Sequence, residues 1–290
     1  MPAAHTRVQL SGSVMVLLVT TAFAQLAPNR PSSAGELVRA VIANELKPQA
    51  TNEARWTYQL DKEETGALQT KQVVETKEGS LDRLLAVNGK SLSLEQQRHE
   101  GERIMKIAHD PEQRHKLEEA RKKDAEQCRN FLQMIPDAFS FSYADEDGDF
   151  VNVKFTPNAR FQPSSREGRV LHEMEGDMWI HARQQRLANI SGHLLHEVKF
   201  GGGLLGHLEK GGQFVVKRTE VAPAKWEMTA MEIQMKGKIL LFKNIAVQQK
   251  ERHTNFRQVS DDLTLADAAD LLTKHTMIAA YPTAGTAAEK

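Results

Sequence analysis

Cysteine is nearly absent from this chain of 290 residues, which contains Cys128 alone. A single thiol cannot form an intrachain disulfide, so packing has to stabilise the fold. Cys128 lies on an apolar stripe with Phe131, Leu132 and Ile135, at the spacing i, i+3, i+4 and i+7. We therefore expect Cys128 to be a small core residue of a helix rather than a reactive thiol.

An excess of charge of either sign is also missing, because 38 basic side chains balance 38 acidic ones. This balance gives no general electrostatic reason to bind nucleic acid, an anionic lipid surface or a strongly charged substrate. We expect no nucleic-acid partner. Any partner should be selected by shape and apolar contact.

Long hydrophobic runs are absent as well. The apolar run near the start covers residues 14–19, which is much shorter than the roughly 20 residues that span a bilayer. His5 and Arg7 precede this run, and Ala22 and Ala24 supply small residues at positions −3 and −1 of a cleavage site. The pattern predicts a signal peptide over residues 1–24 and a periplasmic or secreted mature protein without a transmembrane span.

The usual signatures of hydrolases and metalloenzymes are missing. The chain contains no G-x-S-x-G and no H-E-x-x-H motif. His193 and His196 lie in a segment that reads as a strand, where an odd offset places them on opposite faces. We expect solvent-facing histidines, with no catalytic residue, metal or cofactor.

Two further motifs have structural explanations. Residues 201–206 satisfy G-x-G-x-x-G, but Gly211 and Gly212 interrupt the chain before a helix could follow, so a dinucleotide site is not expected. This segment should form a loop with Leu204 and Leu205 at its tip. The acidic run over residues 145–149 lacks the full spacing of a calcium loop and indicates a hairpin turn.

Helical signals cover two parts of the chain. Residues 36–47 show helical spacing and stop at Pro48. Over residues 93–135, Ser93 with Gln96 fits a capping box, and Asp110 before a proline repeats the pattern. We expect two helices there, the second with a charged, solvated face over residues 112–129.

The remaining periodicity is that of strands. Alternation predicts three antiparallel strands before residue 93 and an almost continuous series of strands and turns over residues 139–257. The apolar phase slips by one residue near Ala230, which predicts a β-bulge. The fold class is therefore α+β, with an antiparallel sheet that is apolar on one face. The individual runs are residues 56–60, 71–76, 81–87, 151–155, 178–181, 187–194, 214–221, 226–235 and 239–247.

The segment Gly176-Asp177-Met178-Trp179-Ile180, followed by Arg186-Leu187 and Ile190-Ser191-Gly192, resembles a strand pair in LolA-like periplasmic proteins, the superfamily of outer-membrane lipoprotein carriers. The resemblance implies a curved antiparallel sheet that forms an unclosed β-barrel, with helices covering the open side over an apolar cavity. It implies one such domain over residues 36–257. The proline, serine and glycine of residues 25–35 indicate a flexible leader before that domain. We expect a short helix and a partly disordered tail within residues 258–290.

Together with these observations, the resemblance implies a non-catalytic binding protein that holds a lipid, an acyl chain or a lipoprotein-like hydrophobic group on the concave face of its sheet. The pattern does not indicate the identity of a receptor or envelope partner. The candidate cavity residues are Trp56, Tyr58, Trp179, Leu204, Leu205, Trp226, Met228, Met231 and Met235.

Three alternatives remain at this point. The same aromatic and methionine side chains could fill a core that binds nothing, which is their commoner role. The protein could be an exported hydrolase or metal-dependent enzyme that uses His172, His193 and His196. It could also be an envelope scaffold that binds other proteins through the charged helix over residues 112–129.

Overall fold

A computed structural model describes residues 31–47, 54–64, 66–200, 206–239 and 248–279. The predicted signal peptide lies outside these residues. The helices are α1 (Ala34–Leu46), α2 (Leu94–His109), α3 (Pro111–Ala138), α4 (Arg166–Leu171) and α5 (Leu265–Ala279). The strands are β1 (Arg55–Glu64), β2 (Ala67–Thr76), β3 (Gly79–Val87), β4 (Lys90–Ser91), β5 (Phe139–Asp147), β6 (Phe150–Pro157), β7 (Met174–His181), β8 (Arg186–Leu194), β9 (Val198–Phe200), β10 (Gly206–Leu208), β11 (Gln213–Ala222), β12 (Lys225–Gln234), β13 (Gly237–Ile239) and β14 (Gln248–Val259).

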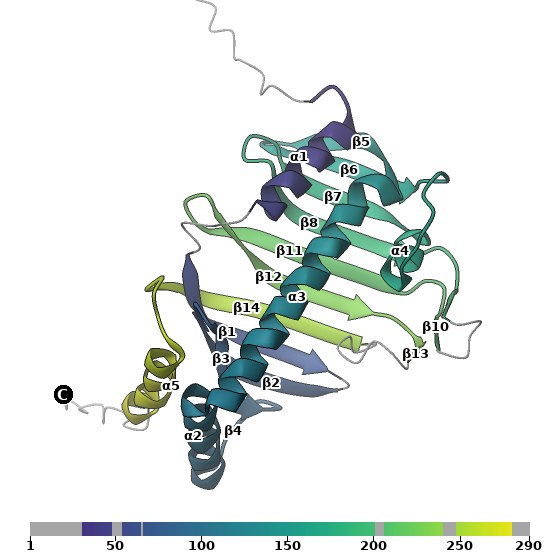
Figure 1. Ribbon diagram of the computed structural model, residues 1–290. Coiled ribbons are helices and arrows are strands. Elements are labelled where there is room, and N and C mark those ends of the chain that lie inside the picture. The colour runs from purple at the N-terminus through teal and green to yellow at the C-terminus, as the bar shows by residue number, and fades with distance from the viewer. Residues whose placement is uncertain (1–30, 48–53, 65, 201–205, 240–247, 280–290) are drawn as a thin grey trace, which may run out of the picture.

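The fold is α+β and is built on one large, curved antiparallel sheet (Figure 1). Its eleven strands follow the order β4-β3-β2-β1-β14-β12-β11-β8-β7-β6-β5. The sheet does not close, because β4 and β5 are separate edges. Strand β14, late in the chain, pairs with β1 on one side and with β12 on the other, so it joins the early strands to the later ones.

Most of the expected strands are confirmed. The register between β11 and β12 shifts where Lys217 pairs with Ala230 and Arg218 pairs with Met228, so the bulge near Ala230 is present. The acidic run forms the turn between β5 and β6, with Gly148 at a φ of 59°. The strand expected over residues 239–247 lies outside the described residues except for Ile239, which ends β13.

The helix signals over residues 93–135 are confirmed at their starts. Ser93 forms the expected capping box, and the Asp110 side chain accepts hydrogen bonds from two backbone N–H groups at the start of α3. Helix α1 begins at Ala34, inside the expected leader, because Ser33 also forms a capping box and Ala34 is buried. Helix α3 continues two residues beyond Pro136 because Ile135 and Ala138 are both buried against the sheet.

The prediction that Cys128 is a core residue is wrong, because its side chain is exposed. Every residue of α3 from 119 to 131 is exposed, so Cys128 and Phe131 contact no core, whereas Leu132 packs on the hydrophobic core. Ile135 alone among the four stripe residues is fully buried. The charged face over residues 112–129 is solvated as expected, and over residues 119–131 the opposite side of the helix is exposed as well.

Helix α5 belongs to the folded unit, which extends beyond Arg257. It buries Leu265, Ala268, Ala269 and Leu272 against α2, β2 and β3. Residues 280–290 lie outside the described part. Among the helices that the structure describes, none has both the length and the apolar composition needed to cross a bilayer.

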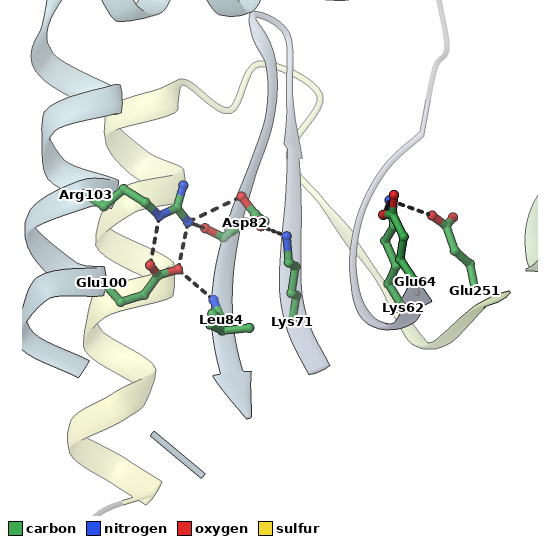
Figure 2. Close-up of polar contacts among 8 residues, drawn as sticks. All are labelled: Lys62, Glu64, Lys71, Asp82, Leu84, Glu100, Arg103 and Glu251. Atoms are coloured by element: carbon green, nitrogen blue, oxygen red, sulfur yellow. Dashed lines mark hydrogen bonds and ion pairs between the residues drawn. The ribbon is translucent and has the colours of Figure 1, made fainter. Parts of the chain in front are cut away.

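Two side chains of α2 satisfy the free edge of β3 (Figure 2). The Leu84 backbone N–H donates to Glu100 Oε1 at 2.7 Å, and Arg103 Nη2 donates to the Asp82 backbone oxygen at 2.6 Å. Burial alone would raise the pKa of Asp82, but hydrogen bonds and charge from Lys71 and Arg103 outweigh it and lower that pKa. Helix α2 therefore acts as a polar cover for the part of β3 that β4 leaves unpaired.

Candidate ligand-binding face of the sheet

The hydrophobic core is divided into two clusters at opposite ends of the sheet. The first core cluster lies on β5 to β8 and includes Val153, Met178 and Ile180, with residues of α1, α3 and α4 packed over them. The second core cluster includes Val74, Leu81 and residues of α2 and α5. The central strands β1, β14, β12 and β11 add no fully buried residue to either cluster.

Helix α3 connects the two ends and crosses the sheet in between (Figure 1). Near its start, Leu117 contacts Gly79 of β3, and near its end Ile135 and Ala138 join the first core cluster. The exposed residues 119–131 form the middle of this crossing. The helix is therefore anchored at both ends and solvated between them.

The strand register defines the inner face, meaning the face that carries the first core cluster. One row of paired residues runs Val153, Met178, Ile190, Val216, Met231, Glu251 and Lys62. The next row runs Phe155, Gly176, Gly192, Phe214, Ile233, Gln249 and Glu64. The central members of both rows, from Phe214 and Val216 to Met231 and Ile233, are half-buried.

The two glycines in the second row explain part of the motif that resembles LolA-like proteins. A Cβ on Gly176 would lie 2.8 Å from Phe155 Cζ, and one on Gly192 would lie 2.7 Å from Phe214 Cε1. The absence of side chains lets both phenyl rings lie flat along the inner face.

Charged and polar side chains continue the inner face on β1 and β14. Lys62 Nζ lies 3.6 Å from Glu251 Oε1 and 3.0 Å from Glu64 Oε2 (Figure 2). His253 and Gln249 also contact the Glu251 carboxylate. Burial raises the pKa of Glu251, but these hydrogen bonds and the charge of Lys62 outweigh it, so its pKa lies below the usual value.

An aromatic cluster lies at the other end of β1. The Tyr58 ring stacks on His253 at 5.1 Å and on Phe256 at 5.2 Å between ring centroids, and Trp56 meets Phe256 edge-on at 6.1 Å. Trp56 Nε1 donates to Glu227 Oε1 at 3.0 Å. Burial raises the pKa of Glu227, although Trp56 and the charge of Arg218 oppose this.

The ionisation of Tyr58 gives a measurable test of this cluster. Burial, together with the charges of surrounding carboxylates, raises the pKa of Tyr58 above its usual 10.0. Folding stability from the neutral phenol is therefore fully present below pH 10 and is lost as pH rises toward the folded-state pKa. We expect the difference in unfolding free energy between the wild type and Tyr58→Phe to fall by about 1.4 kcal/mol per pH unit between pH 10 and the folded-state pKa of Tyr58. Parallel stability profiles of the two proteins in urea titrations would contradict this.

A cleft of about 290 Å³ opens where β1, β12 and β14 end. Ile233 and Gln249 of the inner face line it, so the cleft meets the second row at its end. The other lining residues are Glu63, Gly66, Glu232, Gln234, Gln248 and Lys250.

The structure separates the predicted cavity residues into several groups. Trp56, Tyr58 and Met231 lie on the inner face of the central strands. Met235 packs on the first core cluster, and Met228 is half-buried on β12. Leu204 and Leu205 lie outside the described residues.

The other two tryptophans lie elsewhere. Trp226 is 7 % exposed, packs against Phe150 and His181, and donates to Gln184 Oε1 at 2.6 Å. Trp179 alternates with the core residues Met178 and Ile180, so it lies on the opposite, outer face. It therefore does not share a surface with the inner-face residues.

Sequence reasoning missed Lys62, Glu227, Glu251, His253 and Phe256. For Glu251, His253 and Phe256 the sequence signal was weak, because the inner positions of β14, with the sequence QQKERHTNFRQV, are mostly polar. Two of the histidines considered are in exposed pairs, His193 with Glu175 at 3.3 Å and His196 with Glu173 at 2.8 Å. The third, His172, is half-buried, with its ring 6.3 Å from that of Phe161. The described residues contain no group of three or more potential metal ligands. No protein-family model matches the chain, and no curated protein matches it at a significant level.

Proposed function

We propose that the protein is an exported, non-catalytic binding protein of the LolA-like type, which holds an acyl chain or a similar hydrophobic group between the inner face and α3. The observation that carries this proposal is that the fully buried part of the first core cluster does not continue along the inner face onto the central strands β11, β12, β14 and β1. Apolar side chains of the central strands are left half-buried under a helix that is solvated along its middle. A ligand there would extend the apolar layer of the first core cluster over the central strands. The second core cluster lies on the other face of the sheet, because Val74 pairs with Thr57, which alternates with Tyr58 along β1.

The energetics favour a ligand with an extended apolar part. Val216, Met231 and Ile233 each keep surface that an acyl chain would remove from water. Burial contributes about 25 cal/mol per Å², so roughly 200 Å² would contribute about 5 kcal/mol before the cost of ordering the ligand. A contribution of this size is sufficient for reversible binding, as a carrier requires.

The helices would cover the open side of the unclosed barrel, and α3 is suited to this role. Its exposed middle is stabilised from within, by the ion pair of Lys122 with Glu118 at 2.7 Å and by the contact of His115 Nε2 with Glu119 Oε1 at 3.3 Å. It therefore does not need sheet contacts to remain helical.

Adjacent valines of β11 provide a matched test. Val216 faces inward beside Ile190, whereas Val215 faces outward beside Ser191, and both are half-buried. With cis-parinaric acid as the fluorescent acyl probe, we expect Val216→Glu to weaken binding at least about tenfold and Val215→Glu to leave it within about twofold. Circular dichroism would confirm that both variants fold.

A second variant keeps the test decisive if Val216→Glu does not fold. Met231→Gln places a neutral polar group at the next position of the same row and should also weaken the binding of cis-parinaric acid. Failure of the wild-type protein to bind the probe, or equal effects of the two glutamate variants, would refute the proposal. Native mass spectrometry of the protein from its own envelope fraction should show a bound lipid.

A further inference from the structure

The outer face of β6, β7 and β8 carries Trp179 near its middle, while Phe150 and His181 of the same face pair across β6 and β7 and pack on each other and on Trp226. Cross-strand pairing aligns Asn152, Trp179, Asn189 and Lys217 in one row. The helices that pack on this half of the sheet, α1, α3 and α4, contribute to the first core cluster on the inner face. Core packing therefore does not account for Trp179.

The hydrogen bonding of Trp179 also differs from that of the other tryptophans. The indole N–H groups of Trp56 and Trp226 donate to Glu227 and Gln184. Within the described part of the chain, Trp179 has no such acceptor. Tryptophan combines a large apolar ring with one polar group, and it is enriched where one side of the ring meets a polar partner.

Two amide oxygens beside Trp179 lack donors. Oδ1 of Asn152 and Oδ1 of Asn189 are both buried, and neither accepts a hydrogen bond from the residues that the structure describes. The Asn152 residue is 5 % exposed. An unsatisfied buried acceptor lowers folding stability and calls for an explanation. Two unsatisfied acceptors on either side of one indole suggest a shared explanation for both.

The charges near this row are mixed in sign. Lys154 and Asp177 are paired across β6 and β7 in the neighbouring row, and Lys217 ends the row of Trp179. None of the three takes part in an ion pair within the described residues. One acidic and two basic groups do not form the positive surface that nucleic acid needs, and the polar rim does not suit an acyl chain.

We propose that this outer face binds a carbohydrate. The apolar C–H face of a pyranose ring would stack on the Trp179 indole, and its hydroxyls would donate to the Asn152 and Asn189 oxygens and accept from Lys217. Because both oxygens are covered in the free protein, binding includes a rotation of the indole or of the amides toward the sugar. This site is separate from the inner face and does not depend on the proposed carrier function.

Tryptophan fluorescence of the intact chain tests the proposal, because the rotation changes the surroundings of Trp179. Chitohexaose, maltohexaose and cellohexaose would each be titrated to about 10 mM, with calorimetry as an independent readout. We expect at least one sugar to bind the wild-type protein. Calorimetry should show that Trp179→Ala weakens that binding at least about tenfold. Thr156→Ala, at the far end of the same face of β6, is the matched control and should bind as the wild type does.

A second variant separates a binding role from a structural one. Asn152→Ala removes an unsatisfied oxygen, so it should weaken sugar binding while leaving the melting temperature unchanged or higher. A lower melting temperature with unchanged sugar affinity would assign Asn152 a structural role and overturn the proposal. No binding of any of the three sugars, or wild-type affinity in Trp179→Ala, would also overturn it. Binding of cis-parinaric acid by Trp179→Ala should be unchanged.

Discussion

Substitution of Gly176 by alanine is expected to destabilise the protein by at least about 3 kcal/mol, the largest effect of any single methyl group considered for this chain. The new Cβ would lie 1.9 Å from the Ser191 backbone oxygen, 2.6 Å from Gly192 Cα and 2.8 Å from Phe155 Cζ. Two of these atoms belong to the backbone of the neighbouring strand. The clash can be relieved only by separating β7 from β8.

Gly101 provides the control for this prediction. It lies in α2, and a Cβ there would meet no atom within 4 Å. Gly101→Ala should therefore raise the unfolding free energy by up to about 1 kcal/mol, because alanine has the higher helix propensity. Urea denaturation followed by circular dichroism measures both variants. Wild-type stability in Gly176→Ala would show that the paired register of β7 and β8 is incorrect.

Replacement of Glu45 by alanine is expected to have the second largest effect, a loss of about 2–3 kcal/mol of unfolding free energy. The Glu45 carboxylate, on α1, is 12 % exposed and contacts Arg218 Nη1 at 2.8 Å and Arg186 Nη1 at 3.2 Å. These arginines come from β11 and β8, so Glu45 ties α1 to two strands. Its removal leaves two largely buried guanidinium groups without their shared carboxylate.

The exposed pair between Arg39 and Asp137 is the matched control for Glu45. It also joins α1 to another element, at 2.9 Å, but its side chains are 59 % and 67 % exposed. Asp137→Ala should change stability by less than about 1 kcal/mol, because solvent screens an exposed pair. Comparable losses in the two variants would contradict the role of burial in this argument.

The local elements were predictable because their signals lie within a few residues of one another. The Ser93 capping box and the Asp110 cap correctly predict two helix starts, and the phase slip near Ala230 correctly predicts a bulge. Each depends on hydrogen bonds or side-chain facing between near neighbours in the chain.

The candidate site was only partly predictable. Trp56, Tyr58 and Met231 follow clear alternation and lie on the inner face. Trp179 stands between Met178 and Ile180. Three consecutive apolar residues do not alternate with polar ones, so the sequence did not indicate which face of the strand Trp179 occupies. The core position of its two neighbours places Trp179 on the outer face.

By itself, the sequence determined the α+β class, the antiparallel pairing of neighbouring strands and the polar character of α3, because these follow from short-range periodicity and charge. Only the tertiary structure decided that β14 lies between β1 and β12, bringing Glu251 and His253 beside Lys62 and Tyr58. It also decided that Cys128 faces solvent. The physical reason is that strand order and burial depend on contacts between residues far apart in the chain, which no local pattern encodes.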